Sequence, residues 1–335
     1  MAKKSSLLLL MGFLFLLLAG CGKSADVNKD SSGGNDLKNV TLRIGQTGWG
    51  VFEESLKAAG LSDTPYKVEY TVFQGGNLCL EAMAGDHIDL TETSEIPPII
   101  YAEAANQGNF KIVAVYQSNT LNQEVVVSKN SSLQSIQDLK GKRVGYVKNT
   151  TAQYFLLKML SKANLTWQDI TPVDLSTSDG LMALLSGDID ALASYGNAII
   201  SAHQQGARTI SDARDILSGN FPIEASSTAL QDDQKRAAIN DYLERLNKAQ
   251  DWGAKHPQEW SKIVAANTHQ SYEQAYTTFV EGLKQRNNKV LPISQAAIDS
   301  QQDIANQFSL VGVIKQADAA NFWSHALDEQ IKSWQ

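Results

Sequence analysis

Most signatures of enzymes and of nucleic-acid-binding proteins are missing from this chain of 335 residues. It has no phosphate-binding loop, no dinucleotide-binding glycine fingerprint and no Gly-x-Ser-x-Gly element. Its five histidines are scattered, without the spacing that metal ligands need. Its formal net charge is −7, and an acidic chain is a poor partner for the phosphates of a nucleic acid. The sequence therefore predicts no metal, no cofactor and no nucleic-acid partner.

Cysteines and long apolar runs are also scarce. Cys21 and Cys79 are the only two cysteines, and Cys79 lies between Leu78 and Leu80 in an expected helix. A buried structural thiol is favoured there over a nucleophile, because free cysteines are among the most buried residues. The N-terminal apolar run, residues 7–18, is well short of the roughly 20 residues that a membrane-spanning helix needs. It therefore does not predict a transmembrane segment.

The beginning of the chain has the pattern of an export signal. Two lysines precede the apolar run, and the small residues Ala19 and Gly20 precede Cys21. The stretch Leu-Ala-Gly-Cys resembles the lipobox of bacterial lipoproteins, which implies cleavage before Cys21 and a lipid thioether on its sulfur. The alternative is an ordinary signal peptide whose cysteine is incidental. We predict a signal peptide over residues 1–20 and an extracytoplasmic protein anchored to the bacterial cell membrane through lipidated Cys21.

A flexible tether is expected to follow, because residues 21–39 are polar, rich in glycine and serine, and have no apolar period. If Cys21 carries a lipid, Cys79 has no disulfide partner and the fold depends on its core. Removal of the signal takes away two lysines and no acidic residue, so the net charge falls from −7 to −9. A bound anion must then be held by local dipoles and hydrogen-bond donors, since the overall field repels it.

From Val40 onward, short β-rich segments alternate with amphipathic helical ones. The expected strands are 40–46, 67–73, 87–92, 111–117, 124–129, 142–147, 170–176 and 189–194. The expected helices between them are 51–60, 77–84, 97–106, 151–163 and 179–186, followed by 231–255, 257–267, 271–286, 294–309 and 317–334. This alternation predicts an α/β protein with parallel-rich sheets flanked by helices, on which the helical C-terminal third packs as a further layer.

An internal repeat indicates two similar lobes. Residues 80–108 can be laid on residues 181–206, which matches Gly85-Asp86 to Gly187-Asp188. Each copy predicts a helix ended by a glycine in the left-handed conformation, a short strand, a polar elbow and a second helix. The elbows fall at the carboxyl ends of strands, where open α/β sheets bind ligands.

Several motifs in this order resemble a known family. They are Phe-Gln-Gly-Gly at 73–76, Leu-Glu-Ala-Met-Ala-Gly-Asp at 80–86, Thr-Ser-Glu-Ile-Pro-Pro-Ile at 93–99, Asp-Leu-Lys-Gly-Lys-Arg-Val-Gly at 138–145 and the segment 298–314. Together with the lipobox, they are similar to the substrate-binding proteins of ABC importers for aliphatic sulfonates, taurine and nitrate. The resemblance implies a two-lobed type II periplasmic-binding-protein fold, with the ligand in a cleft that closes by hinge motion.

The resemblance also implies where the lobes meet. The two crossings are expected near 126–130 and 223–228, with the first lobe formed by 40–127 plus 223–335 and the second by 128–222. This sequence departs from the family at Ser94-Glu95, where Gly-Asp is common, and at Tyr195-Gly196-Asn197, where Trp-Asp-Pro is common. Both places are expected to line the cleft, so the ligand of this chain can differ from that of the best-known members.

Four polar elbows are the candidate ligand-binding groups. They contain Gln74, Gly75 and Asn77; Thr93 and Ser94; Asn149, Thr150 and Thr151; and Ser178 and Asp179. A sulfonate spreads one charge over three oxygens, so hydroxyls, amides and helix-start N–H groups suit it. The resemblance carries over to Gln74, Gly75, Thr93, Ser94, Thr150 and Thr151. Helix capping alone is the alternative explanation for Asn77, Ser94, Thr150 and Ser178.

Some further residues have two interpretations. Gly48 and Trp49 follow the first strand, so Trp49 either walls the ligand's apolar stem, which we favour, or belongs to the core. Lys148 either approaches the anion or is simply solvated, which is the usual state of lysine. Glu92 or Glu95 either pairs with an amine on the ligand or only complements a helix dipole.

These observations favour a binding protein and not an enzyme. We predict an extracytoplasmic, monomeric lipoprotein that captures a small organic anion of the aliphatic sulfonate or taurine class and delivers it to an ABC permease with its ATPase. One alternative is a binding protein for nitrate, an amine or a pyrimidine precursor. Another is an enzyme on the same fold, similar to desulfinases or to pyrimidine-forming relatives, and a third is a sensing or adhesive lipoprotein.

Overall fold

A computed structural model describes residues 37–102 and 109–335, and residues 35–335 form one compact unit. The helices are α1 (Val51–Ala58), α2 (Gly76–Ala84), α3 (Ile96–Ala102), α4 (Thr151–Lys162), α5 (Thr177–Ser186), α6 (Asn197–Gln204), α7 (Ser227–Gln231), α8 (Asp233–Lys255), α9 (Pro257–Thr268), α10 (Tyr272–Gln285), α11 (Gln295–Leu310) and α12 (Asp328–Ser333). Short 3₁₀ helices span Leu37–Asn39, Ile136–Leu139, Trp167–Asp169, Ala319–Phe322 and His325–Leu327. The predicted signal peptide, Cys21 and nearly all of the tether lie outside the described residues.

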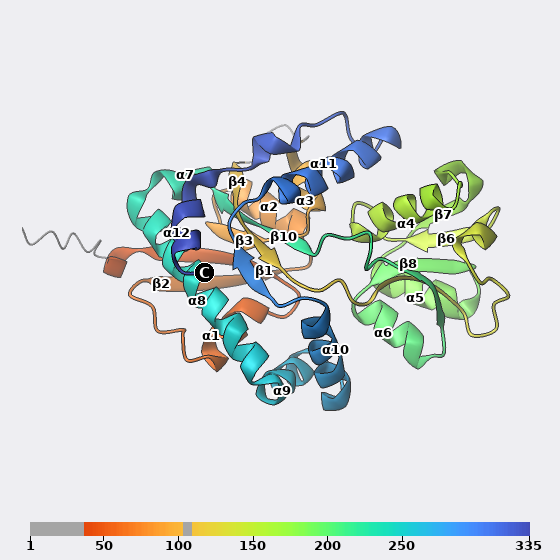
Figure 1. Ribbon diagram of the computed structural model, residues 1–335, viewed down its shortest axis with the longest axis horizontal. Coiled ribbons are helices and arrows are strands. Elements are labelled where there is room, and N and C mark those ends of the chain that lie inside the picture. Colours follow the sequence, from red (N-terminus) through yellow and green to blue (C-terminus); the bar gives the residue numbers. More distant parts are fainter. Residues whose placement is uncertain (1–36, 103–108) are drawn as a thin grey trace, which may run out of the picture. The chain divides into compact units, whose positions relative to one another are not determined.

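The strands form two mixed sheets (Figure 1). They are β1 (Thr41–Thr47), β2 (Lys67–Phe73), β3 (Leu90–Glu92), β4 (Phe110–Gln117), β5 (Gln123–Val127), β6 (Arg143–Tyr146), β7 (Thr171–Asp174), β8 (Ala191–Tyr195), β9 (Arg208–Asp212), β10 (Asn220–Ser226) and β11 (Lys289–Leu291). The six-stranded first sheet has the order β11-β4-β10-β3-β1-β2, and the five-stranded second sheet has the order β7-β6-β8-β5-β9. The predicted α/β fold is confirmed, and antiparallel strands complete the parallel part of each sheet.

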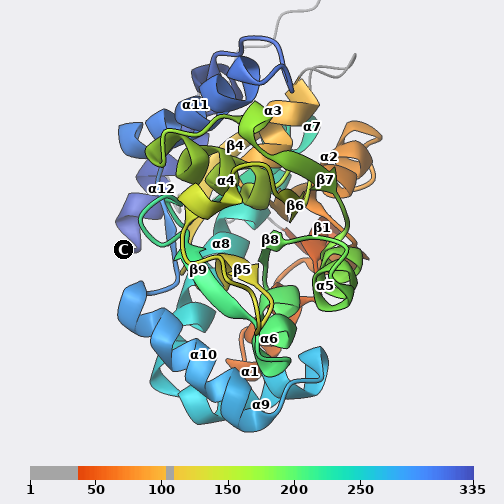
Figure 2. The same ribbon diagram turned by 90° about the vertical axis from the view of Figure 1, so that its right-hand side faces the viewer.

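Helices cover both faces of each sheet because successive strand residues face opposite sides. In the second sheet, Val125 and Val127 pack with α4, whereas Val126 packs with α6, on the other face (Figure 1). In the first sheet, Leu42 and Ile44 pack with α8, and Ile112 packs with α2. Helices α9 and α10 pack against each other in the C-terminal third (Figure 2). Near-continuous apolar strands are what two covered faces require.

The internal repeat is visible as two equivalent three-stranded units, β2-β1-β3 and β7-β6-β8. The matched turn shifts by one residue, because Gly85 has φ −80° and is not left-handed. The left-handed residues that end the two helices are Asp86 (φ 58°) and Gly187 (φ 84°). The predicted conformation is therefore right for Gly187 and wrong for Gly85, whose neighbour adopts it instead.

An equivalent arginine–aspartate pair joins two strands within each of these units. In the first sheet, Asp89 accepts hydrogen bonds from the main-chain N–H of Arg43 at 2.9 Å and from its guanidinium at 3.0 and 2.7 Å. In the second sheet, Asp190 accepts from the N–H of Arg143 at 2.8 Å and from its guanidinium at 3.4 Å. The pairs differ in burial: the Asp89 side chain is fully buried and also binds Lys235 of α8, whereas that of Asp190 is 34% exposed.

The chain passes between the sheets at other places than expected. Strand β5 pairs with β8 and β9 in the second sheet, although its residues were assigned to the first lobe. Strand β10 begins at Asn220 in the first sheet, between β3 and β4. The two connections are therefore residues 118–122 and 213–219, not 126–130 and 223–228. Apolar runs such as that of β5 fit either sheet equally well, so their sequence does not reveal which one they join.

Three strands and the end of the chain differ from the sequence pattern. Strands β9, β10 and β11 were not expected; β10 contains Pro222 and β11 is only three residues long. Residues 317–334 form two 3₁₀ turns and a short helix where one helix was expected. The tertiary contacts of these segments decide their structure, because their local preferences are weak.

We expect Asp89→Asn to lower the free energy of unfolding by about 2–3 kcal/mol, since Arg43 and Lys235 lose a buried charged partner. The matched Asp190→Asn should cost less than about 1 kcal/mol, because its pair is exposed to water. Urea unfolding at pH 7 measures both changes. Equal losses in the two variants would contradict a larger contribution of Asp89 than of Asp190 to the free energy of unfolding.

The same pair gives a pH dependence. Burial opposes ionisation of Asp89, yet hydrogen bonds from Arg43 and Lys235 outweigh it and hold its pKa below the ordinary 3.8. The stabilisation by Asp89 is therefore fully present above the unfolded-state pKa and is lost as the pH falls through the lowered folded-state pKa. The difference in stability between wild type and Asp89→Asn should disappear in that acidic range.

Candidate functional site

A cleft of about 850 Å³ lies at the carboxyl ends of strands from both sheets. Its lining comes from the ends of β1, β2, β3, β6 and β8, from the connection after β4, and from β10. The lining residues are Thr47, Gly48, Gln74, Gly75, Gly76, Asn77, Glu92, Thr93, Ser94, Pro97, Ile100, Ser118, Asn119, Leu121, Gln123, Lys148, Asn149, Thr150, Thr151, Tyr195, Gly196 and Phe221. This is the edge at which open α/β sheets bind ligands.

The structure brings most of the predicted site residues to this cleft. Those that line it are Gly48, Gln74, Gly75, Asn77, Thr93, Ser94, Asn149, Thr150, Thr151 and Tyr195. Those outside the lining are Trp49, Glu95, Ser178, Asp179 and Asn197. A place in the lining is a matter of geometry, so the binding role of each residue stays a prediction.

Three residues outside the lining have partners elsewhere. The ring of Trp49 lies 5.9 Å from that of Trp260, centre to centre. Glu95 is buried, and its Oε2 accepts a hydrogen bond from Ser218 at 2.7 Å. Asn197 Oδ1 accepts one from the side-chain amide of Gln270 at 3.2 Å. Trp260 and Gln270 lie on or just after α9, so these contacts are distant in sequence.

The fourth predicted elbow is a helix cap. Ser176 is the N-cap of α5, and its hydroxyl oxygen accepts a hydrogen bond from the N–H of Asp179 at 3.1 Å. The Asp179 carboxylate in turn accepts from the Ser176 hydroxyl at 2.7 Å. The alternative of capping therefore explains this elbow, although the cap is Ser176 and not Ser178.

Capping also accounts for Thr150 at the start of α4. Its hydroxyl oxygen accepts from the N–H of Ala152 at 3.2 Å and donates to the carbonyl of Val147 at 2.7 Å. The hydroxyl of Thr151 donates to Gln123 Oε1 at 2.6 Å and so joins α4 to β5. Both hydroxyl protons are engaged within the protein.

Donors in the first-sheet elbows are free by comparison. The N-cap position of α2 is Gly75, which leaves Asn77 without a capping role. Among the described residues, the side chains of Gln74, Asn77 and Ser94 make no hydrogen bond. Capping therefore does not explain Asn77 or Ser94, and these polar groups are available to a ligand.

The side chain of Thr93 is hydrogen-bonded to a buried carboxyl group. Its Oγ1 lies 2.7 Å from Oε1 of Glu224, a fully buried residue of β10. Burial raises the pKa of Glu224 well above its ordinary value, because it disfavours the ionised form of the carboxyl group. The hydrogen bond to Glu224 fixes the position of the Thr93 hydroxyl at the cleft.

Glu92 and Lys148 are the only charged residues in the described lining. Glu92 is partly exposed at the cleft wall, and burial raises its pKa to about 7. Lys148 is exposed at the opposite elbow, which fits both of its interpretations. Among residues 37–102 and 109–335, no hydrogen bond or salt bridge joins either side chain to the protein.

The sequence reasoning missed several lining residues. Ser118, Asn119, Leu121 and Gln123 lie in or beside the connection from the first sheet to the second. Three of these four residues are polar, but the crossing was expected at 126–130, so nothing in the sequence pattern indicated them. Phe221 was missed because β10 was not recognised as a strand.

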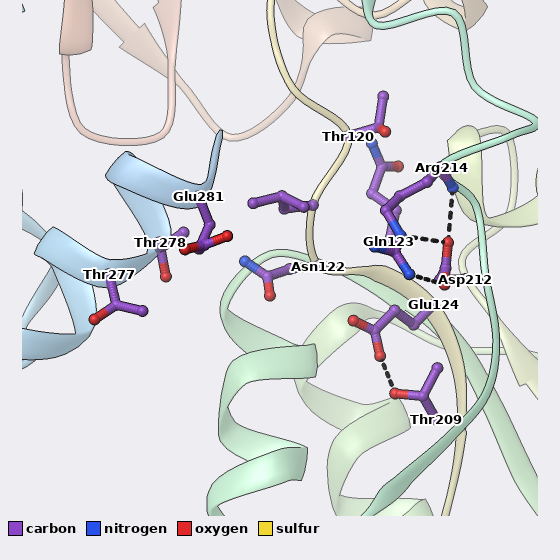
Figure 3. Close-up of a pocket in the computed structure, with 11 residues that line it drawn as sticks. Thr120, Asn122, Gln123, Glu124, Thr209, Asp212, Arg214, Thr277, Thr278 and Glu281 are labelled. Atoms are coloured by element: carbon purple, nitrogen blue, oxygen red, sulfur yellow. Dashed lines mark hydrogen bonds and ion pairs between the residues drawn. The ribbon is translucent and has the colours of Figure 1, made fainter. Parts of the chain in front are cut away.

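A second cavity of about 410 Å³ lies against the same connection (Figure 3). Leu121 and Gln123 line both hollows, so this segment separates them. Its lining has three carboxylates, Glu124, Asp212 and Glu281, and one cation, Arg214, which binds Asp212 at 2.8 Å. With more carboxylates than cations, this cavity is a poorer anion site than the cleft.

Neither a metal centre nor a membrane-spanning helix is present in the described part of the chain. No group of three or more His, Cys, Asp or Glu residues there has the arrangement of a metal site. No helix in the same residues is long and apolar enough to cross a membrane. Cys79 is buried and unpaired, as expected for a structural thiol.

The fold and the cleft define a class. Two mixed α/β sheets with a ligand-sized cleft at their strand ends are the architecture of type II periplasmic-binding proteins. Residues 68–260 match the family described as NMT1/THI5 like. The chain belongs to the NMT1/THI5-like family.

Curated relatives add a more specific similarity. Two of them carry the name "Putative aliphatic sulfonates-binding protein". The one from Escherichia coli is 31% identical over 189 residues, which are 55% of this chain and 59% of that protein. The one from Bacillus subtilis is 25% identical over 346 residues, covering 97% of this chain and 98% of that protein. The chain thus matches little more than half of the first relative and nearly all of the second.

Solved structures share the fold. The periplasmic aliphatic sulphonate binding protein SsuA from Escherichia coli has a TM-score of 0.76 at 24% identity, covering 85% of this chain and 92% of that one. The alkanesulfonate-binding protein from Xanthomonas axonopodis, bound to MOPS, has a TM-score of 0.73 at 24% identity, covering 86% and 99%. The desulfurization enzyme DSZB has a TM-score of 0.66 at 16% identity, covering 88% and 98%. Binding proteins and an enzyme therefore have this fold.

We expect Gly76→Ala to lower the free energy of unfolding by about 1–3 kcal/mol, as overpacking does. A Cβ at Gly76 would lie 2.9 Å from Thr93 and 3.0 Å from Pro97, so the two elbows of the first sheet would be pushed apart. Gly253→Ala is the control, because its Cβ would meet nothing nearer than 3.7 Å. Urea unfolding compares them, and a neutral Gly76→Ala would show that the elbows do not need this close approach.

Proposed function

We propose that this protein is an extracytoplasmic solute-binding lipoprotein that captures a small organic anion, an aliphatic sulfonate or a taurine-class compound, for an ABC import permease and its ATPase. The observation that carries the proposal is the set of unpaired polar groups in the cleft. The side chains of Gln74, Asn77 and Ser94 have no hydrogen-bond partner among the described residues, and Lys148 adds one cation. Such groups complement the three oxygens and single charge of a sulfonate.

The other walls of the cleft suit an organic stem. Ile100, Leu121, Tyr195 and Phe221 supply apolar and aromatic surface beside the polar elbows. Pockets for small molecules combine such surface with a few oriented polar groups. The names of the two curated relatives, and those of the sulfonate-binding proteins from Escherichia coli and Xanthomonas axonopodis with the same fold, support the same class of ligand.

Binding is favoured over catalysis. The described cleft lining contains neither cysteine nor histidine, the side chains that most often act as nucleophile or general base. Cys79 is buried and does not line the cleft, and its pKa is raised to about 11 by burial, the opposite of an activated thiol. An enzyme remains the second candidate function, because DSZB has the same fold.

We expect closure of the cleft to accompany binding and the monomer to be the working form. The segments 118–122 and 213–219 connect the sheets and are the places where a hinge would act. The lipid anchor on Cys21 would keep the protein at the membrane that holds the permease.

A ligand panel tests the proposed class. We expect ethanesulfonate or taurine to raise the melting temperature, since a ligand at about 100 times its Kd adds about 2.7 kcal/mol of stability. Nitrate, ethylamine and a pyrimidine complete the panel, and calorimetry confirms direct binding. If one of these three binds and no sulfonate does, the proposed ligand class is wrong.

Two serine variants tie that binding to the cleft. Ser94→Ala removes a free hydroxyl of the lining, whereas Ser178→Ala removes a hydroxyl outside it. We expect Ser94→Ala alone to weaken sulfonate binding, by roughly a factor of ten, as for one lost hydrogen bond to a charged group. Equal effects of the two variants would place the ligand elsewhere.

The predicted anchor has its own test. In bacteria that express the full chain, we expect the wild-type protein in the membrane fraction and labelled by a fatty acid. Cys21→Ser removes the sulfur that would carry the lipid, so this variant should lose the label and the membrane association. Unchanged fractionation and labelling of Cys21→Ser would contradict a lipid on this residue.

A further inference from the structure

The charges of the cleft are few and oppositely signed. Of the described lining residues, only Glu92 is anionic and only Lys148 is cationic. They come from different sheets: Glu92 ends β3, and Lys148 follows β6. A ligand with one positive and one negative group would match both charges, whereas a simple anion would match only one.

Glu92 has no compensating cation among residues 37–102 and 109–335. On β10, Ile223 is its strand neighbour, and the next residue, Glu224, is a buried carboxyl group bonded to Thr93. Tyr116 on β4 and Cys79 on α2 are the other titratable groups close enough to interact with it, and neither is positive. No salt bridge reaches Glu92 from any described residue.

This isolation distinguishes Glu92 from the other acidic groups around it. Glu95 is bonded to Ser218, and Glu224 is bonded to Thr93, and neither lines the cleft. Glu92 alone offers a carboxyl group to the space that the ligand would occupy. An unpaired carboxylate there repels an anion, unless the ligand also carries a cation.

We propose that Glu92 selects sulfonates that carry a positively charged nitrogen, so that the preferred ligand is a zwitterionic aminoalkanesulfonate. The ligand's ammonium contacts Glu92, while its sulfonate is bound by the neutral donors and Lys148. This inference rests on the proposed function and adds the residue that sets specificity within it.

The pKa of Glu92 supports this role. Burial raises the pKa of Glu92 to about 7, so the group is partly protonated at neutral pH in the empty protein. A bound ammonium favours the ionised form and would lower this pKa, whereas a bound anion favours the neutral form. Affinity for an aminosulfonate should therefore rise between pH 6 and pH 8, and affinity for a plain alkanesulfonate should fall.

In such an experiment, the titration of Glu92 must be distinguished from that of the groups around it. Glu95 has a pKa raised to about 7 by burial and changes charge in the same range, whereas Cys79, Tyr116 and Glu224 have pKa values shifted upward. Lys148 faces the cleft from the other sheet. Variants of Glu92 and Glu95 are therefore compared side by side.

The test uses two ligands that differ by one amine, 2-aminoethanesulfonate and ethanesulfonate. Calorimetry gives Kd for each at pH 6 and pH 8 with the wild-type protein, Glu92→Gln and Glu95→Gln. We expect the wild type to prefer the aminosulfonate, and Glu92→Gln to reduce that preference at least about tenfold, as expected for a lost charged hydrogen bond. Glu95→Gln should change both affinities by the same factor.

The dependence of each Kd on pH gives a second readout. We expect opposite slopes for the two ligands in the wild type and their loss in Glu92→Gln. If both sulfonates bind but Glu92→Gln leaves their ratio and slopes unchanged, this inference is overturned and the proposed function stands. A wild-type protein that prefers ethanesulfonate, because Glu92 stays protonated, would also overturn this inference and leave the proposed function standing. If neither sulfonate binds, the proposed function fails and this inference fails with it.

Discussion

The cleft depends on one constraint, the arginine–aspartate pair that joins β1 to β3 in the first sheet and β6 to β8 in the second. Asp89 and Asp190 each bind both the main-chain N–H and the guanidinium of an arginine on the neighbouring strand. Such a contact sets the register of the two strands, and register decides which residues reach the strand ends. The elbows at Thr93 and Tyr195 follow those aspartates by a few residues, so their position at the cleft derives from these pairs.

The two copies of the unit are not equally supported. Lys235 of α8 adds a third charged group to the first pair, whose Asp89 side chain is fully buried, while the second pair faces water. Helix α8 therefore stabilises the first sheet through this charge, whereas α11 packs on α4 over the second sheet, where Asp303 accepts hydrogen bonds from Tyr154 and Lys158. The free polar side chains Gln74, Asn77 and Ser94 lie on the better-supported side, where a rigid frame can hold donors in position.

Much of this could be predicted from the sequence, for identifiable reasons. Apolar periodicity located the strands up to β8 and most helices, and glycine and polar residues after strands located three of the four elbows. Sheet membership could not be read from β5, because a strand covered on both faces has the same composition in either sheet. Trp49 and Asn197 were misplaced because their partners, Trp260 and Gln270, lie in distant helical segments whose packing no local pattern reveals.

The least predictable feature was the balance of charge in the cleft, since it depends on what surrounds each group. Glu95 and Glu92 are three residues apart and have similar sequence surroundings, yet one is bonded to Ser218 and the other has no partner. Desolvation of an unpaired carboxylate is unfavourable in the empty protein, and it is relieved by a proton or by a cation. Because the described cleft supplies no cation beside Glu92, the identity of the ligand decides which of the two relieves it.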